Sequence, residues 1–372
     1  MDPEQSKLLR FALDAVNTAI ANGEFTASDD VKVNSALMAA IEEAIGRADV
    51  LAPEEYAWFT QKVRHHTRTR GIFLRRVRRS HLKRWGRAFQ LFDRSLSTAV
   101  VLNSALEDSI GRWITDDETP RPEFLLGVDG ALGGVELKCL LLLSLQSRAC
   151  SISHEIRLLV EHGFPEAVVA RNRSLHELAV IAESLSHRGP SDTEVSDRYG
   201  AWTVAEARKD ARLAADQGLP YEPLAGADAE LERRAEATWG RDFFKQNGWA
   251  SPLFPGRRPP IPFSDIEKIT GMDHRRSYYA AGNEAIHAGP TALAERARFR
   301  NGSIFPTASE VQHDTVRNFL AVAAMTLSQV SIESCRAISY LTEDYDALFA
   351  VKPIVDAVDA TVNELKNGGM RP

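Results

Sequence analysis

The sequence predicts an all-α protein: a multi-helix bundle with a smaller, basic helical part at its N-terminal end. Apolar residues recur at three- and four-residue spacing through most of the chain, which is the spacing of a helix face. Helix start and stop signals separate these stretches, and we find no convincing run of strands between them. The 372 residues are 44% hydrophobic and 26% charged, as in a globular protein with a sizeable core.

The helical stretches follow one another along the whole chain. Ser28 offers an N-cap ahead of an acidic first turn, and Pro53 suits the first turn of a further helix. Leu137 to Leu145 is apolar on most sides, which predicts a helix in the middle of the bundle. The expected helices cover 5–21, 28–46, a stretch opening at Pro53, 88–114, 135–161, 163–186, 203–216, 228–247, 273–288, 309–341 and 351–365.

The connections between these helices are polar or rich in proline. The segment TDDETPRP, Thr115–Pro122, predicts a linker between a basic helical part over 1–118 and a helical bundle over 123–372. Residues 187–192 predict a turn, and Trp249–Phe263, with its five prolines, predicts a loop. Ser264 and Glu267 have the spacing of a capping box, in which each side chain satisfies an amide at a helix start.

Cysteine use and hydropathy indicate the compartment. Cys139, Cys150 and Cys335 form no CxxC pair, which predicts buried thiols in a reducing environment. The start of the chain lacks the apolar core of a signal peptide, and the apolar runs are far shorter than the roughly 20 residues of a membrane span. We therefore expect a cytoplasmic protein with no membrane partner. The sequence contains no Walker A loop, no GxGxxG after a strand, no GxSxG elbow and no HExxH motif, so P-loop NTP hydrolysis, hydride transfer and serine hydrolysis are poorly supported.

A basic stripe runs from Lys62 to Arg87 and contains eleven Lys or Arg residues and no Asp or Glu. Phe73, Trp85 and Phe89 are interleaved with it or adjacent to it. Such a stripe can neutralise phosphates, and aromatic rings can stack on bases. The alternative is a solvated face that pairs with some of the chain's 51 acidic residues. The stripe predicts binding of a nucleic acid (RNA) or another polyanion by Arg68, Arg70, Arg75, Arg76, Arg78, Arg79, Lys83 and Arg84.

A first polar cluster interrupts the otherwise apolar helix 163–186. It consists of Arg171, Asn172, Arg173, Ser174, His176 and Glu177. Arg173, His176 and Glu177 share one helix face, whereas Arg171 lies about 140° around the helix from His176. Two interpretations remain open. The cluster is either a ligand or catalytic site, or a structural i,i+4 ion pair between Arg173 and Glu177 that braces the bundle.

A second polar cluster, Tyr279, Asn283, Glu284 and His287, lies about a hundred residues later on an Ala-rich helix. If it meets the first, Arg173, Glu177, Tyr279, Asn283 and His287 would form a pocket for a phosphate or carboxylate. The alternative for His287 is a hydrogen-bonded core histidine. Glu284 and His287 also have the Glu-x-x-His spacing of di-iron bundles, but no second such pair accompanies them, so we expect neither a metal nor another cofactor.

The two clusters carry a resemblance to a known family. GFPEAVVARNRSLHELAVIAESL, a DRYG segment at 197–200 and YYAAGNEAIHAGP at 278–290 resemble a family of helical bacterial proteins known only as domain of unknown function 5677. The resemblance covers roughly 130–345 and leaves out the basic stripe. The matching positions are Arg173, Ser174, Glu177, Tyr279, Asn283 and His287.

A shorter motif suggests a chemistry. RNRSLH, Arg171 to His176, is similar to the R-x4-6-H motif of the HEPN superfamily of helical ribonucleases and nucleotide-binding proteins. That resemblance implies a metal-independent endoribonuclease used in stress or phage defence, often with its site at a homodimer interface. His176 would be the general acid or base, Arg171 would stabilise the phosphate, and Asn172 would orient. The competing hypothesis is a non-enzymatic helical module that binds a polyanion, a small anionic ligand or a partner protein.

Overall fold

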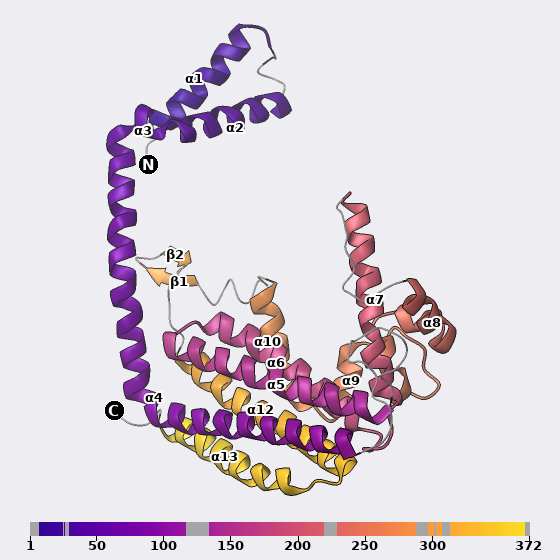
Figure 1. Cartoon of the computed structure of the whole chain (residues 1–372). Coiled ribbons are helices and arrows are strands. Elements are labelled where there is room, and N and C mark those ends of the chain that lie inside the picture. The colour runs from indigo at the N-terminus through magenta and orange to yellow at the C-terminus, as the bar shows by residue number, and fades with distance from the viewer. Residues whose placement is uncertain are drawn as a thin grey trace. The chain divides into compact units, whose positions relative to one another are not determined.

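The computed structural model describes residues 7–24, 26, 30–116, 134–218, 229–287, 297–300, 303–306 and 313–368 (Figure 1). Helices dominate it, so the all-α fold class is confirmed. The chain divides into two compact units, Met1–Arg76 and Val77–Pro372. This division falls inside a helix, whereas most of the predicted linker Thr115–Pro122 lies outside the described residues.

The first unit contains α1 (Lys7–Ala21), α2 (Asp30–Gly46), the short α3 (Ala48–Leu51) and the start of α4 (Pro53–Asp116). Helices α1 and α2 pack on each other through small side chains, among them Ala12 and Ala44, which are almost fully buried. Among the residues of this unit whose burial the structure describes, few large apolar side chains are buried. Val31 and Met38 on α2, and Trp58 and Phe59 on α4, are exposed.

Helix α4 is 64 residues long and joins stretches that the sequence presented separately. No proline occurs between residues 54 and 116, so every backbone amide in this stretch can donate within the helix. From Val77 onward, one face of α4 is buried in the second unit through Trp85, Phe89, Phe92 and Leu102.

The second unit is built around α5 (Gly134–His162), α6 (Pro165–Ser186) and α12 (His313–Thr342), which all pack on one another. Figure 1 shows these helices side by side, with α13 (Val351–Gly368) against α12. The amide of Gln146 on α5 donates to the carbonyl oxygen of Ala99 at 3.2 Å and to Ser331 Oγ at 3.0 Å, so it links α5 to α4 and α12. The prediction of a central apolar helix over 135–161 is therefore confirmed.

Helix α7 (Glu194–Asp216) begins nine residues before the predicted start at 203, and α8 (Ala229–Trp239) is shorter than predicted. The 3₁₀ helices η2 (Arg241–Phe244) and η3 (Gly248–Leu253) follow α8. The turn at 187–192 is confirmed. The buried Lys138 on α5 holds it, donating to the carbonyl oxygens of Gly189 and Asp192 at 2.8 and 2.7 Å. Burial lowers the pKa of Lys138 to about 8.

Three further elements follow: α9 (Phe263–Ile269), η4 (Asp273–Arg275) and α10 (Arg276–Ile286). The predicted capping box is wrong. The N-cap of α9 is Pro262, and no side chain caps it. The side chain of Glu267 reaches helix α6 instead.

The expectation of no strands is also corrected, because β1 (Ala297–Arg300) and β2 (Ser303–Pro306) pair in antiparallel orientation. The 3₁₀ helix η5 (Asp346–Ala350) precedes α13.

The predicted burial of the three cysteines is confirmed. Cys139, Cys150 and Cys335 are free and buried, and burial raises the pKa of these thiols to about 12, 12 and 11. In the parts of the chain that the structure describes, no helix combines the length and apolar character that a bilayer span requires.

Candidate functional site

The two polar clusters meet where α10 crosses α6. The crossing depends on Gly282, because a Cβ there would lie only 2.6 Å from Arg173 Cβ and 3.3 Å from the carbonyl oxygen of Val169. A glycine at this position lets the two helix backbones approach closely. The Ala-rich face noted in the sequence therefore serves close helix packing, with Gly282 at the point of contact.

Arg173, Glu177 and Tyr279 form a closed triangle at this crossing. Arg173 Nε and the Tyr279 hydroxyl both donate to Glu177 Oε1, each at 3.1 Å. The Arg173 guanidinium also lies 5.2 Å from the centre of the Tyr279 ring. Burial and then the charge of Glu177 raise the pKa of Tyr279. The three groups satisfy one another, as expected of a brace between helices.

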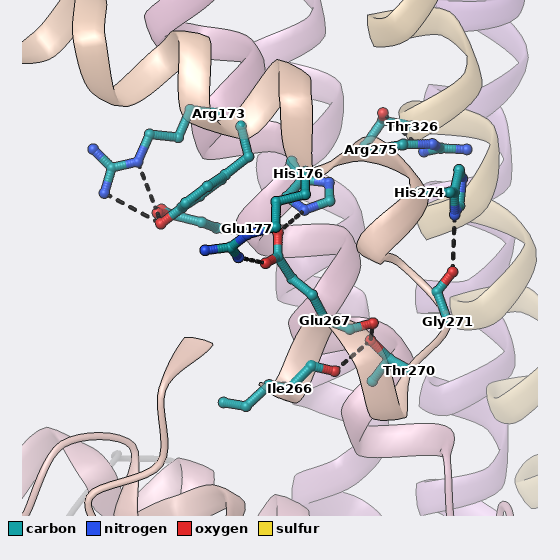
Figure 2. Close-up of polar contacts among 12 residues, drawn as sticks. Arg173, His176, Glu177, Ile266, Glu267, Thr270, Gly271, His274, Arg275 and Thr326 are labelled. Atoms are coloured by element: carbon teal, nitrogen blue, oxygen red, sulfur yellow. Dashed lines mark hydrogen bonds and ion pairs between the residues drawn. The ribbon is translucent and has the colours of Figure 1, made fainter. Parts of the chain in front are cut away.

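His176 forms a second set of contacts beside this triangle, with its ring centre 5.6 Å from that of Tyr279 (Figure 2). Its Nε2 donates to Glu267 Oε1 on α9 at 2.8 Å, and Arg276 at the start of α10 donates to the other oxygen of the same carboxylate. His176 is 4% exposed and Glu267 is fully buried. Burial lowers the pKa of His176, although the hydrogen bond and charge of Glu267 act in the opposite direction. His176 is therefore a neutral donor that joins α6 to α9.

One polar atom of His176 has no partner among the described residues. Its Nδ1 is buried without a hydrogen bond to any of them, and so is Oδ1 of Asn172, four residues earlier on the same helix. The amide nitrogen of Asn172 donates to the carbonyl oxygen of Val168 at 2.9 Å. Two neighbouring orphan acceptors on one helix face are the arrangement that a buried water molecule satisfies.

Arg171 lies away from His176, as the helical period predicts. Its guanidinium pairs with Glu155 on α5, on the opposite flank of α6. The three residues that the HEPN-like motif singled out thus contact three different partners: Arg171 contacts Glu155, Asn172 contacts its own helix, and His176 contacts Glu267. Within one chain the structure does not bring Arg171 and His176 to a common surface.

The remaining predicted ligand residues stand apart from the triangle. Asn283 is half-buried, and its carbonyl oxygen accepts from the amide of His287, which caps α10 and is exposed. Among the residues that the structure describes, neither side chain forms a hydrogen bond with Arg173 or Glu177. Of the second cluster, only Tyr279 meets the first.

Arg275 and Arg276 were not predicted as site residues, and Glu267 was predicted only as part of a capping box. Arg275 donates to Thr326 Oγ1 at 3.0 Å and to Gln329 Oε1 at 3.2 Å, which fastens η4 to α12, and burial lowers its pKa. Glu267 was misassigned to a helix cap. The one available signal was an acidic residue between the apolar Ile266 and Ile269, a position that faces the core.

The basic stripe is exposed, unlike the buried contacts of α6, α9 and α10. Its eleven Lys and Arg side chains are all exposed. Arg78 pairs with Glu161 and Arg87 lies 3.7 Å from Glu364; the other nine form no ion pair with any described residue. On each side of the division at Arg76 these residues recur at helical spacing, for example Arg64 and Arg68 before it, and Arg79 and Lys83 after it.

Two of the aromatic residues near the stripe are not exposed as predicted. Trp85 and Phe89 are buried in the core of the second unit, so they cannot stack on bases. Phe73 is exposed, and so are Trp58 and Phe59, which the sequence did not single out. Lys62 Nζ lies 5.4 Å from the centre of the Trp58 ring, which places a cation and an aromatic face together at the start of the stripe.

Residues 140–304 match a family of unknown function (DUF5677). The match contains both polar clusters and Glu267 and excludes the basic stripe, so the predicted resemblance is confirmed over a shorter range. It lends no support to the HEPN resemblance. Comparison with curated proteins finds no match, and comparison with solved structures finds none either.

Proposed function

We propose that this protein binds RNA through the basic stripe of α4 and does not cleave it. The observation that carries the proposal is the stripe itself: eleven exposed cations, of which nine have no carboxylate partner among the described residues. Cations already paired within a protein cannot release counterions from a phosphate backbone, whereas unpaired ones can.

The binding would be largely independent of base sequence. Lys and Arg on one helix contact phosphates, which carry no sequence information. The exposed rings of Trp58, Phe59 and Phe73 would add stacking on unpaired bases, which favours single strands over duplexes. In this proposal the polar clusters of α6 and α10 hold the bundle together and do not touch the ligand.

Cleavage through Arg171, Asn172 and His176 has weaker support. A general acid or base must come within about 3 Å of the proton that it moves, and His176 is 4% exposed and hydrogen-bonded to Glu267. Arg171 is paired with Glu155 on the other flank of the helix. Incubating the full chain and its His176→Ala variant with RNA tests this activity, since turnover by the wild type that the variant loses would refute the non-cleaving proposal.

Fluorescence anisotropy with labelled single-stranded RNA tests the binding. We expect affinity to fall steeply between about 50 and 200 mM salt. In the triple variant R68Q/R75Q/R79Q the slope of log affinity against log salt should shrink by about two, because each phosphate contact on a single strand contributes about 0.7.

The matched control is R47Q/R188Q/R241Q, which removes the same charge from arginines that are paired with Glu43, with Asp192 and Glu194, and with Glu236. It should bind as the wild type does. Equal losses in the two triple variants would mean that net charge alone governs binding, and absence of binding by the wild type would refute the proposal.

A further inference from the structure

A groove of about 300 Å³ opens between α12 and α13, away from the α6–α10 crossing. Its apolar walls are Met325 and Ile332 from α12 and Val355 and Val358 from α13. The volume matches a small ligand with an aliphatic portion. The polar groups that line the same groove decide which kind of ligand fits.

Two of these polar groups are without partners. Ser328 is 7% exposed, and its hydroxyl forms no hydrogen bond with any described residue. Asp359 is exposed at the rim and has no ion-pair partner in the described part of the chain. A buried hydroxyl that lines a groove with no partner of its own is a group that a ligand can satisfy.

The third polar group is an acid with a second acid beside it. Glu333 lines the groove and is 8% exposed, and it lies within hydrogen-bonding reach of Glu183 on α6. Burial, and then the charge of Glu183, raise the pKa of Glu333, while Arg336 at 2.6 Å lowers it. A cation is favoured beside a buried carboxyl group that has a second carboxyl group next to it, because a positive charge offsets both the burial and the repulsion.

The charges around the groove leave room for one more cation. Glu333 on α12 pairs with Arg336 and lies next to Glu183 on α6, while the guanidinium of Arg275 is engaged by Thr326 and Gln329. The neighbouring Asp356 is already paired with Lys352. Of the two acids that line the groove, Glu333 has one cationic partner, Arg336, and Asp359 has none among the described residues.

We propose that this groove binds a small primary alkylammonium compound, with the ammonium group between Glu333 and Asp359, Ser328 accepting one of its hydrogens, and the alkyl chain against Val355 and Val358. A primary ammonium has three donors and no acceptor, which matches two carboxylates and a hydroxyl oxygen. The apolar walls disfavour a hydrated metal ion, which keeps its waters. This site is independent of the basic stripe and of RNA binding.

Ligand-observed NMR with the full chain tests the site, using n-butylamine as the probe and 1-butanol as its neutral isostere. We expect saturable binding of butylamine and none of butanol at the same concentration. Asp359→Asn should weaken binding at least tenfold and, because Asp359 is exposed, should leave the fold intact. Asp346→Asn, which removes an exposed acid outside the groove, should bind as the wild type does.

Binding by butanol, or equal affinity in the two variants, would overturn the proposal, and so would the absence of saturable binding. Nα-acetyl-lysine methylamide distinguishes the source of the ammonium group. If it binds more tightly than butylamine, the occupant is a lysine side chain of another protein and the assignment to a small amine is wrong. Glu333→Gln adds a second test, because it removes the carboxylate on the α12 side of the groove and should also weaken the binding of butylamine.

Discussion

The α6–α10 crossing and the basic stripe of α4 are both rich in arginine, but they place it in opposite environments. Arg173, Arg275 and Arg276 each reach a partner on another element and tie helices together. Arg68, Arg75 and Arg79 face solvent without an ion-pair partner among the described residues. The difference teaches that a cluster of charges in a helix is informative about function only when its partners are known. Charges paired inside the protein stabilise it, and unpaired charges outside remain available for a ligand.

The largest expected effect is a loss of stability when the buried Glu267 is replaced. Glu267→Ala should lower the free energy of unfolding by about 3 kcal/mol, because His176 loses its acceptor and the half-exposed Arg276 loses a buried carboxylate. Glu267→Gln, which keeps an acceptor, should cost less. Denaturant unfolding of the full chain measures both. Glu107→Ala, at an exposed position on α4, should change stability by less than about 0.5 kcal/mol, and similar losses at Glu107 and Glu267 would contradict the brace.

The second effect concerns the close approach of α6 and α10. Gly282→Ala should destabilise the protein by about 1–3 kcal/mol, since the new methyl group would overlap Arg173 Cβ and push the triangle apart. Gly86→Ala is the matched control, because no atom lies within 4 Å of its Cβ position on α4. That variant should stabilise the helix by up to about 1 kcal/mol. If Gly282→Ala left the free energy of unfolding unchanged, the two helices would not cross as described.

The stability of the protein should depend on pH through the buried His176. Because burial lowers the pKa of His176, the unfolded chain binds its proton more readily than the folded protein does. The stability contribution is complete above the ordinary histidine pKa of about 6.5 and is lost as pH falls below it. His176→Gln should flatten this part of the stability profile between about pH 7 and 5.5. Denaturant unfolding of the wild type and the variant at several pH values measures the difference, and identical profiles for the two would contradict the assignment.

The smallest expected effect on stability is at the exposed basic stripe. R68Q/R75Q/R79Q should change the free energy of unfolding by no more than about 0.5 kcal/mol, because no ion pair with a described residue is broken. Added salt should slightly stabilise the wild type relative to this variant by screening repulsion along the stripe. A large loss of stability would show that the stripe braces the fold, and it would remove the basis for RNA binding.

The sequence by itself determined the helices, the buried cysteines and the exposed basic stripe. Pro53, Gly163 with Pro165, and the turn at 187–192 mark helix boundaries because capping and proline geometry act over a few residues. Burial of Cys139, Cys150 and Cys335 follows from the apolar pattern around them. An all-basic stretch cannot satisfy itself internally, so its exposure also follows from local composition.

Only the tertiary structure decided which charges have partners. Glu267 meets His176 across 91 positions of sequence and Tyr279 meets Glu177 across 102, and no local pattern encodes such pairs. For the same reason the sequence misplaced Trp85 and Phe89, which face the core on one side of a helix whose other side is basic. Helical periodicity shows which residues share a face, but the packing of other helices decides whether that face meets protein or solvent.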